Sequence, residues 1–279
     1  MTRYDLSLAA ADYAPWDGAP RKSLIIASHP RSGSTMLGEA VAFAGGLGCP
    51  LEYLHRGFRP ALAARWQAPD LEAYVAAMHR YRTDASGTLS IKLFWQDICE
   101  LLLERRPGDD PALLERPAEE VPAEDYRDIA AILGTILPDP HYVYLYRRDA
   151  LRQAVSSLIA TQTGVWRLVG GAAGAAVTGP AEYDYDRIMA LLAFGAFSHG
   201  HWRAFFAANR IVPHAIAYED MVADPDRVIG ALLGELGATS NVPPPRRMQR
   251  QADGVGDAMM LRFLQDHAVR SAAGAPGVS

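Results

Sequence analysis

Short apolar runs alternate with longer segments of helical pattern along this chain. The runs are rich in β-branched and aromatic residues, which is typical of buried strands. Predicted strands cover residues 24–27, 88–95, 141–146 and 215–218. Predicted helices cover residues 34–44, 122–136, 149–161, 185–208 and 226–236. Because strands alternate with helices, we expect an α/β fold: a single domain with a mainly parallel central sheet flanked by helices.

The predicted domain covers residues 21–270, because no linker separates two cores. Residues 1–20 form a polar N-terminal arm, and residues 271–279 are expected to be a flexible tail. Two segments resemble insertions. Residues 105–121 are dense in proline and acid, and residues 168–180 are rich in glycine and alanine. Each is predicted to be either a mobile surface loop or a lid over the site.

Composition excludes several classes of protein. With 279 residues, of which 49% are hydrophobic and 21% charged, the chain can bury a substantial core. A formal net charge of -5 argues against a general nucleic-acid binder, so any anion site must be local. Cys49 and Cys99 are too few for a disulfide framework and have no metal-ligand spacing. Without a secretory signal or a long apolar span, the sequence predicts a cytoplasmic protein that needs no metal.

Residues 28–35 (S-H-P-R-S-G-S-T) form the most informative motif. A loop that joins a strand directly to a helix directs backbone N–H groups and the positive helix end at one place, which suits phosphate or sulfate. Gly33 allows close backbone approach, and Arg31 adds a planar positive group. Further donors are the hydroxyls of Ser32, Ser34 and Thr35. The alternative is an ordinary turn with a Ser/Thr helix cap.

This loop differs from the nucleotide-kinase pattern G-x-x-x-x-G-K-[ST]. Ser28 takes the place of the first glycine, and Ser34 takes the place of the lysine. That lysine normally reaches the β- and γ-phosphates, and the sequence offers no convincing acidic partner for magnesium. The pattern therefore disfavours a P-loop nucleotide kinase.

Together with P-L-E-Y at residues 50–53, the R-S-G-S-T loop resembles the bacterial trehalose 2-sulfotransferase family and, more distantly, the wider sulfotransferases that use 3′-phosphoadenosine 5′-phosphosulfate (PAPS). The resemblance continues at residues 91–95, 144–149, 153–156, 161–166 and 250–253. It implies a P-loop-like sulfotransferase fold, PAPS as the sulfate donor, no metal, and a homodimer. The residues expected to hold the 5′-phosphosulfate are Arg31, Ser32, Gly33, Ser34 and Thr35.

The resemblance also implies a second anion site, for the 3′-phosphate of PAPS. In the family, an arginine that ends a strand and a serine in the following helix bind this group. Arg147 and Ser156 match them here, Arg148 is the competing choice, and Arg250 is a further candidate. Taken without the resemblance, the two adjacent arginines are equally typical of a solvated basic pair.

Sulfuryl transfer to an alcohol needs an in-line hydroxyl and a base for its proton. Glu52 matches the proposed proton acceptor of the resembling family and lies in an apolar, turn-rich segment, where the pKa of a carboxyl can rise. Glu39, in the helix after the loop, is the alternative base, although helix solvation or an ion pair explains it equally well. We therefore predict Glu52 as the base.

The acceptor site is predicted to include His29, Pro50, Glu52, Tyr53 and Lys92. His29 stands where the trehalose enzymes carry a glutamine that contacts sugar. Because of this difference, we expect the acceptor to be a carbohydrate or glycolipid, and trehalose itself is not implied. A charge inside an apolar strand needs an anionic partner or a route to water, which makes Lys92 a candidate. Trp66 and Trp166 could stack on a sugar, but packing explains each of them more simply.

These observations predict a PAPS-dependent sulfotransferase that acts by in-line transfer with a glutamate base. The alternatives are a P-loop nucleotide kinase and a non-catalytic nucleotide-binding regulatory protein.

Overall fold

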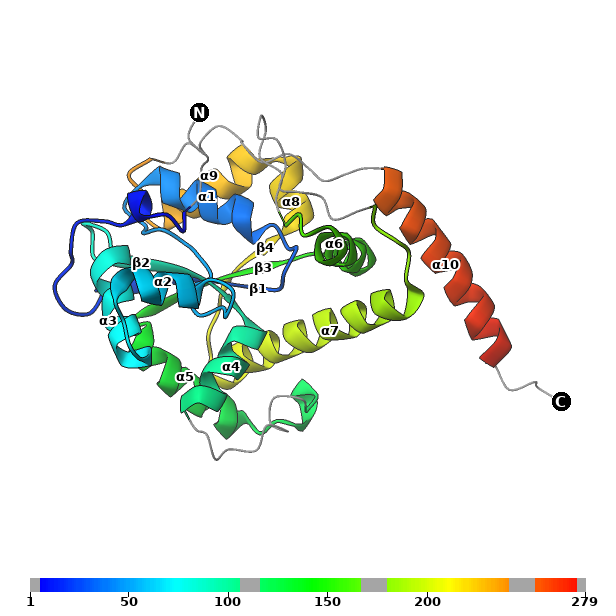
Figure 1. The fold of residues 1–279 in the computed structure, drawn as a ribbon, viewed down its shortest axis with the longest axis horizontal. Coiled ribbons are helices and arrows are strands. Elements are labelled where there is room, and N and C mark those ends of the chain that lie inside the picture. Colours follow the sequence, from blue (N-terminus) through cyan, green and yellow to red (C-terminus); the bar gives the residue numbers. More distant parts are fainter. Residues whose placement is uncertain (1–5, 106–115, 167–179, 241–253, 275–279) are drawn as a thin grey trace. The chain divides into compact units, whose positions relative to one another are not determined.

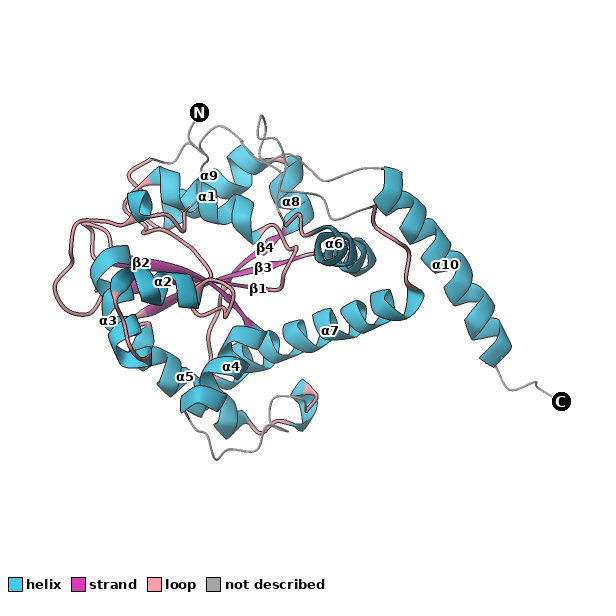
Figure 2. Ribbon diagram, in the orientation of Figure 1, coloured by secondary structure: helices cyan, strands magenta, loops and turns pink. Residues whose placement is uncertain are grey.

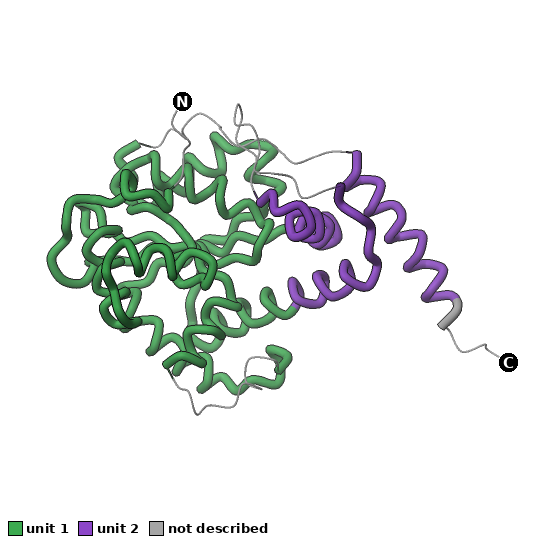
Figure 3. The backbone as a smooth tube through the Cα atoms, viewed as in Figure 1, with its two compact units in different colours: residues 1–148, 197–245 green, residues 149–196, 246–279 purple. Residues whose placement is uncertain are grey.

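The computed structural model describes residues 6–105, 116–166, 180–240 and 254–274. The chain divides into two compact units (Figure 3). Unit 1 contains residues 1–148 and 197–245, and unit 2 contains residues 149–196 and 246–279. The division falls at the start of one helix and within another, so no composition change marks it in the sequence.

In the described part of unit 1, a parallel sheet is flanked by helices (Figures 1 and 2). Its strands are β1 (Lys22–Ser28), β2 (Thr88–Phe94), β3 (Pro140–Tyr146) and β4 (His214–Ala217). They lie in the order β2-β1-β3-β4, and every pairing is parallel. This result confirms the predicted α/β fold and its parallel sheet.

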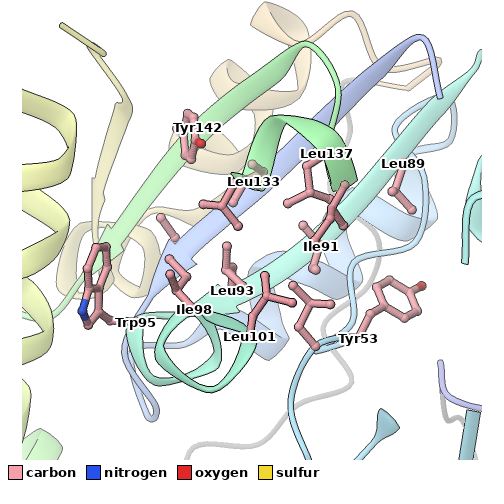
Figure 4. Packing of buried hydrophobic residues seen from close by; sticks show 14 of the residues in the cluster. Tyr53, Leu89, Ile91, Leu93, Trp95, Ile98, Leu101, Leu133, Leu137 and Tyr142 are labelled. Atoms are coloured by element: carbon pink, nitrogen blue, oxygen red, sulfur yellow. The ribbon is translucent and has the colours of Figure 1, made fainter. Parts of the chain in front are cut away.

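Alternation along the strands divides the core of unit 1 between the two sheet faces. On β1, Leu24 and Ile26 join α1 (Ser34–Ala44), α8 (Tyr218–Ala223) and α9 (Pro225–Glu235). Ile25 and Ala27 alternate with them and belong to a larger cluster on the opposite face. Figure 4 shows part of this larger cluster. Helices that contribute to this cluster are α2 (Arg59–Trp66), α3 (Leu71–Arg82), α4 (Trp95–Arg105), α5 (Ala123–Ile136) and the end of α7 (Tyr185–Ala208). Both sheet faces are therefore covered, as a parallel sheet requires.

The described part of the predicted N-terminal arm is fixed to unit 1 by buried charges. It contains the short 3₁₀-helix η1 (Ala9–Ala11); a second one, η3 (Ala118–Glu120), precedes α5. The Asp12 carboxylate lies 2.9 Å from Arg82 Nε and 2.8 Å from an Arg65 nitrogen. The Arg82 side chain is fully buried and also donates to the Leu6 carbonyl. The arm is thus a packed part of this unit.

Unit 2 contains α6 (Ala150–Thr163), the beginning of α7, and α10 (Gly254–Gly274). Asp149 caps α6 by accepting a hydrogen bond from the Arg152 N–H at 2.9 Å. The unit has its own small apolar cluster, made by Ala154, Val155, Leu158, Ile188, Met259 and Phe263. The helix α10 continues through residues 271–274, which were predicted to begin the flexible tail.

The predicted strands and helices all occur close to their expected positions. No range was predicted for α2, α3, α4, α8 or α10. Both candidate lids fall largely outside the described residues. None of the described helices is both long and apolar enough to cross a membrane.

Candidate functional site

The candidate site lies at the carboxyl edge of the sheet in unit 1. After β1 the chain proceeds to β2 on one side, whereas β3 and β4 lie on the other side. The strand order therefore changes direction between β1 and β3, and ligands of open α/β sheets bind outside the carboxyl ends of strands at such a point. Residues 29–33 follow β1 there, and Arg147 follows β3.

The loop after β1 has the geometry of an anion site. Gly33 has φ 91°, and a Cβ atom added to it would lie 2.6 Å from Tyr218 Cδ2, so only glycine fits. Because Gly33 is also the residue that precedes α1, it has no side chain with which to cap the helix. The Ser32 hydroxyl is fully buried, and no hydrogen-bond partner for it occurs in the described chain. Free first-turn amides and a buried hydroxyl together favour an anionic ligand.

Arg147 approaches this loop from the end of β3. Its Nη1 donates to the Arg31 carbonyl at 3.2 Å, and its guanidinium lies 4.4 Å from the centre of the Tyr218 ring. A Glu219 carboxylate oxygen is 3.9 Å from its Nε. Burial and the positive charge of Arg147 both lower the pKa of Arg31. The charge of Arg147 thus opposes that of Arg31, and a bound phosphate or sulfate would offset this repulsion.

Arg148 has different surroundings, although it is the next residue. Its guanidinium is exposed and donates to the Asp220 carboxylate at 2.7 Å, and its backbone N–H donates to Glu219. The structure thus directs Arg147, rather than Arg148, at the loop. Ser156 lies on α6 in unit 2, and Arg250 lies outside the described residues, so a 3′-phosphate site that includes them stays a prediction.

Glu52 and Lys92 form an ion pair beside the same edge. Lys92 Nζ lies 2.8 Å from Glu52 Oε1, and the two side chains are 6% and 15% exposed. A backbone hydrogen bond from Lys92 N–H to the Leu51 carbonyl, at 3.0 Å, joins the Glu52 segment to β2. The buried lysine therefore has the anionic partner that its position required. The expectation that nonpolar groups surround the Glu52 carboxylate is wrong in this respect, because an ammonium group contacts it.

Two further predicted acceptor residues, Pro50 and Tyr53, and the alternative base Glu39 are all buried. Pro50 is buried beside α1, since a Cβ added to Gly38 would lie 3.5 Å from it. Glu39, the alternative base, is also buried on α1. Tyr53 is fully buried in the core, and its hydroxyl donates to the Cys49 carbonyl at 2.6 Å. The prediction that its side chain contacts acceptor is corrected: this side chain packs the core and fixes the turn.

The two tryptophans that were candidates for sugar stacking have different surroundings. Trp66 packs against the rings of Tyr53, Tyr74 and Tyr81, and its Nε1 donates to Asp12. Trp166 is exposed and lies in unit 2. The packing interpretation therefore holds for Trp66.

His29 lies next to a second histidine that sequence reasoning missed. The His29 side chain is buried, and its ring centre is 5.8 Å from that of His199 on α7. Tyr144 and His199 share a hydrogen bond of 2.8 Å through His199 Nδ1. Burial lowers the pKa of His29 to about 3 and that of His199 to about 4. Both rings are therefore neutral near pH 7 and can exchange hydrogen bonds with hydroxyl groups without adding charge.

Asp97 is another residue of this edge that the sequence did not reveal. It lies in the first turn of α4, is 1% exposed, and accepts a hydrogen bond from the Phe94 N–H at 3.0 Å. Burial, and then the charges of Glu52 and Glu100, raise its pKa to about 8. An acid three residues after the end of a strand is a common helix-capping signal, so the sequence alone gave no reason to assign it to the site.

The described residues contain no group of three or more His, Cys, Asp or Glu side chains that could hold a metal ion. The site is instead composed of backbone amides, hydroxyls, guanidinium groups and a carboxylate–ammonium pair. Such groups can bind a strongly anionic donor and accept one proton from a neutral acceptor.

Comparison with known proteins is consistent with this chemistry. The sequence model described as Stf0 sulphotransferase matches residues 23–266. Trehalose 2-sulfotransferase of Mycolicibacterium smegmatis is 26% identical over 260 residues, which cover 88% of this chain and 96% of that protein. Trehalose 2-sulfotransferase of Mycobacterium tuberculosis is 27% identical over 271 residues, with 88% and 95% coverage. A solved sulfotransferase domain from the Synechococcus PCC 7002 olefin synthase is 16% identical, covers 92% of this chain and 98% of that domain, and has a TM-score of 0.31.

Proposed function

This chain belongs to the Stf0 sulphotransferase family and is a sulfotransferase, and we propose that it transfers the sulfuryl group of PAPS to a hydroxyl of a carbohydrate or glycolipid. The observation that carries the proposal is the contact of Arg147 with the Arg31 carbonyl, which brings two cations to the loop that precedes α1. The Arg147 guanidinium lies over the Tyr218 ring and its positive charge opposes that of the buried Arg31, and an anion bound beside them would stabilise both cations.

The loop residues fit the donor's 5′-phosphosulfate. Backbone amides from Gly33 onward, the hydroxyls at positions 32, 34 and 35, and the Arg31 side chain offer donors at one helix start. Arg147 adds a second cation at this edge, and with Ser156 and Arg250 it is our proposed contact for the 3′-phosphate. A nucleotide kinase would place a lysine at Ser34, which argues against ATP as the donor.

Glu52 serves as the base in the proposed reaction. It accepts the acceptor hydroxyl's proton as the new O–S bond forms and the S–O bond to the donor's phosphate breaks, so that 3′-phosphoadenosine 5′-phosphate (PAP) leaves. The 2.8 Å contact with Lys92 fixes the position of the Glu52 carboxylate. A positioned general base typically contributes about 10² to 10⁴ in rate.

The acceptor class rests on the relatives and on His29. Both curated relatives are named for trehalose, a sugar. The neutral rings of His29 and His199 offer uncharged hydrogen-bonding atoms, which suit sugar hydroxyls. Pro50 and Lys92 complete the proposed acceptor side.

Two assays test the proposal. Calorimetric titration with PAP and with ATP–magnesium should show selective binding of PAP, whereas selective binding of ATP–magnesium would favour a kinase. Radiolabelled PAPS, incubated with the protein and a glycan panel, should yield a sulfated glycan. A protein that binds PAP yet sulfates no acceptor would instead support a regulatory role.

Matched variants of the two glutamates test the base. Glu52→Gln should keep PAP affinity and lose about 10² to 10⁴ in turnover. Glu39→Gln serves as the control, because its side chain is also buried but lies on α1. A loss of turnover confined to Glu39→Gln would reverse the assignment.

A further inference from the structure

Only one oxygen of the Asp97 carboxyl has a hydrogen-bond partner among the described residues. Oδ2 accepts the Phe94 N–H and so caps the start of α4, a role that an asparagine could also fill. Oδ1 is buried, and no hydrogen-bond partner for it occurs among the residues that the structure describes. An ionised carboxylate in this setting would be costly, whereas a protonated carboxyl is tolerated far better.

The position of Asp97 connects it with the proposed transfer site. Phe94, whose N–H it accepts, pairs in register with Ser28, the last residue of β1 before the anion loop. Lys92, two residues earlier on β2, holds Glu52. Capping of α4 therefore brings a third ionisable group to the edge where the base and the anion loop lie.

The charges that face Asp97 come from three elements. Glu52 on the turn before α2 and Glu100 on α4 both oppose its ionisation, and Lys92 on β2 favours it. Burial is the largest effect, and together these groups raise the pKa of Asp97 to about 8.

We propose, on the basis of the function proposed above, that Asp97 is a positioning residue for the general base: its protonated carboxyl leaves Glu52 as the carboxylate that Lys92 holds, and its ionisation stops transfer. With Asp97 neutral, Glu52 and Lys92 balance each other. With Asp97 ionised, two carboxylates compete for one ammonium group, and the added negative charge opposes the anionic donor. In each turnover the acceptor's proton moves to Glu52, while Asp97 keeps its own.

The variant Asp97→Asn tests this role, because asparagine keeps the capping acceptor and stays neutral. We expect wild-type turnover, measured from about pH 6 to about pH 10, to fall about tenfold for each pH unit above the ionisation of Asp97. Asp97→Asn should lack this alkaline fall, so that its turnover at alkaline pH stays close to its own value at neutral pH. Glu100→Gln is the matched control: it removes one charge that opposes ionisation, so the fall should begin at lower pH. An identical alkaline fall in the wild type and Asp97→Asn would overturn the proposal.

A second measurement needs neither donor nor acceptor. NMR titration of the wild-type protein with isotope-labelled aspartate carboxyls should show one aspartate that titrates near pH 8, far above the ordinary value of 3.8, and that is missing from Asp97→Asn. If every aspartate titrates near its ordinary value, the assignment of Asp97 is wrong. Because this result does not depend on PAPS, it separates failure of the Asp97 role from failure of the proposed donor.

Discussion

Replacing Gly33 with alanine should destabilise the protein and weaken donor binding together. The backbone there has φ 91°, where a side chain costs about 1–2 kcal/mol. The added Cβ would also lie 2.6 Å from Tyr218 Cδ2 and 3.0 Å from Met221 Cε, and overpacking of this kind costs about 1–3 kcal/mol. The free energy of unfolding should therefore fall by about 2–5 kcal/mol.

Gly38→Ala is the matched control on the same helix. Its added Cβ would lie 3.5 Å from Pro50 and 3.6 Å from Lys92 Cδ, which is ordinary van der Waals distance. Alanine is also favoured over glycine in a helix interior by about 1 kcal/mol. Gly38→Ala should consequently be neutral or slightly stabilising, although it carries the same chemical change five residues further along.

Urea unfolding and calorimetric titration with PAP measure the two effects. The Gly33→Ala side chain must displace Tyr218, whose ring contacts the Arg147 guanidinium, so we expect PAP affinity to fall at least about tenfold, or about 1.4 kcal/mol. Gly38→Ala should bind PAP as the wild type does. Equal stability of the two variants, or unchanged PAP affinity in Gly33→Ala, would refute the reasoning about this loop.

Three further changes test separate parts of the structure. Arg147→Ala should weaken PAP binding by about 1.5–3 kcal/mol, as expected for a hydrogen-bonded charge, while Arg148→Ala should alter it little because Asp220 already binds that guanidinium. Because the pKa of Asp97 is raised in the folded protein, the unfolded chain loses this proton at lower pH than the folded chain does. The free energy of unfolding of the wild type, measured in urea, should therefore fall by up to about 5 kcal/mol as pH rises from about 4 to about 8. This fall should be absent from Asp97→Asn. Asp12→Ala removes the carboxylate that pairs with the buried Arg82 and should reduce stability by about 3–5 kcal/mol.

Each of these has a result that would contradict it. Equal PAP affinities of the Arg147 and Arg148 variants would remove the assignment of Arg147 to the loop. Parallel pH–stability curves for the wild type and Asp97→Asn would show that Asp97 ionises normally. A stable Asp12→Ala protein would mean that the other partners of Arg82, such as the Leu6 carbonyl, suffice to hold it and the N-terminal segment.

The strand, loop and helix that contain the proposed anion site could be predicted from the sequence because their determinants are local. Strand, loop and helix follow one another without interruption, so hydrophobic pattern and the Gly33 signal suffice to place them. Lys92 was also predictable in part, since a charge in an apolar strand requires compensation. What the pattern could not identify was the partner: Glu52 lies forty residues earlier, and only the parallel pairing of the chain near Leu51 with β2 joins them.

The residues that were missed depend on contacts between distant segments. Tyr218 reads as an ordinary residue near the end of a short strand, yet it packs against Gly33 and Arg147 because β3 and β4 are neighbours. His199 lies in a long apolar helix, where a histidine usually satisfies core hydrogen bonds, and its proximity to His29 follows from the packing of α7 on the sheet. The prediction that the Tyr53 side chain contacts the acceptor rested on a local match to the family motif. In the structure this side chain packs into the core.

The distribution of charge along the carboxyl edge indicates how the parts of the site depend on one another. Arg31 and Arg147 concentrate positive charge beside the start of α1, while Glu52 and Lys92 form a neutral pair near the end of β2. A donor with several negative charges is then attracted to the first group and not repelled by the second, provided that Asp97 stays protonated. In the proposed reaction, Lys92 and a protonated Asp97 together limit the negative charge beside Glu52, which would allow a carboxylate to act as the base close to an anionic donor.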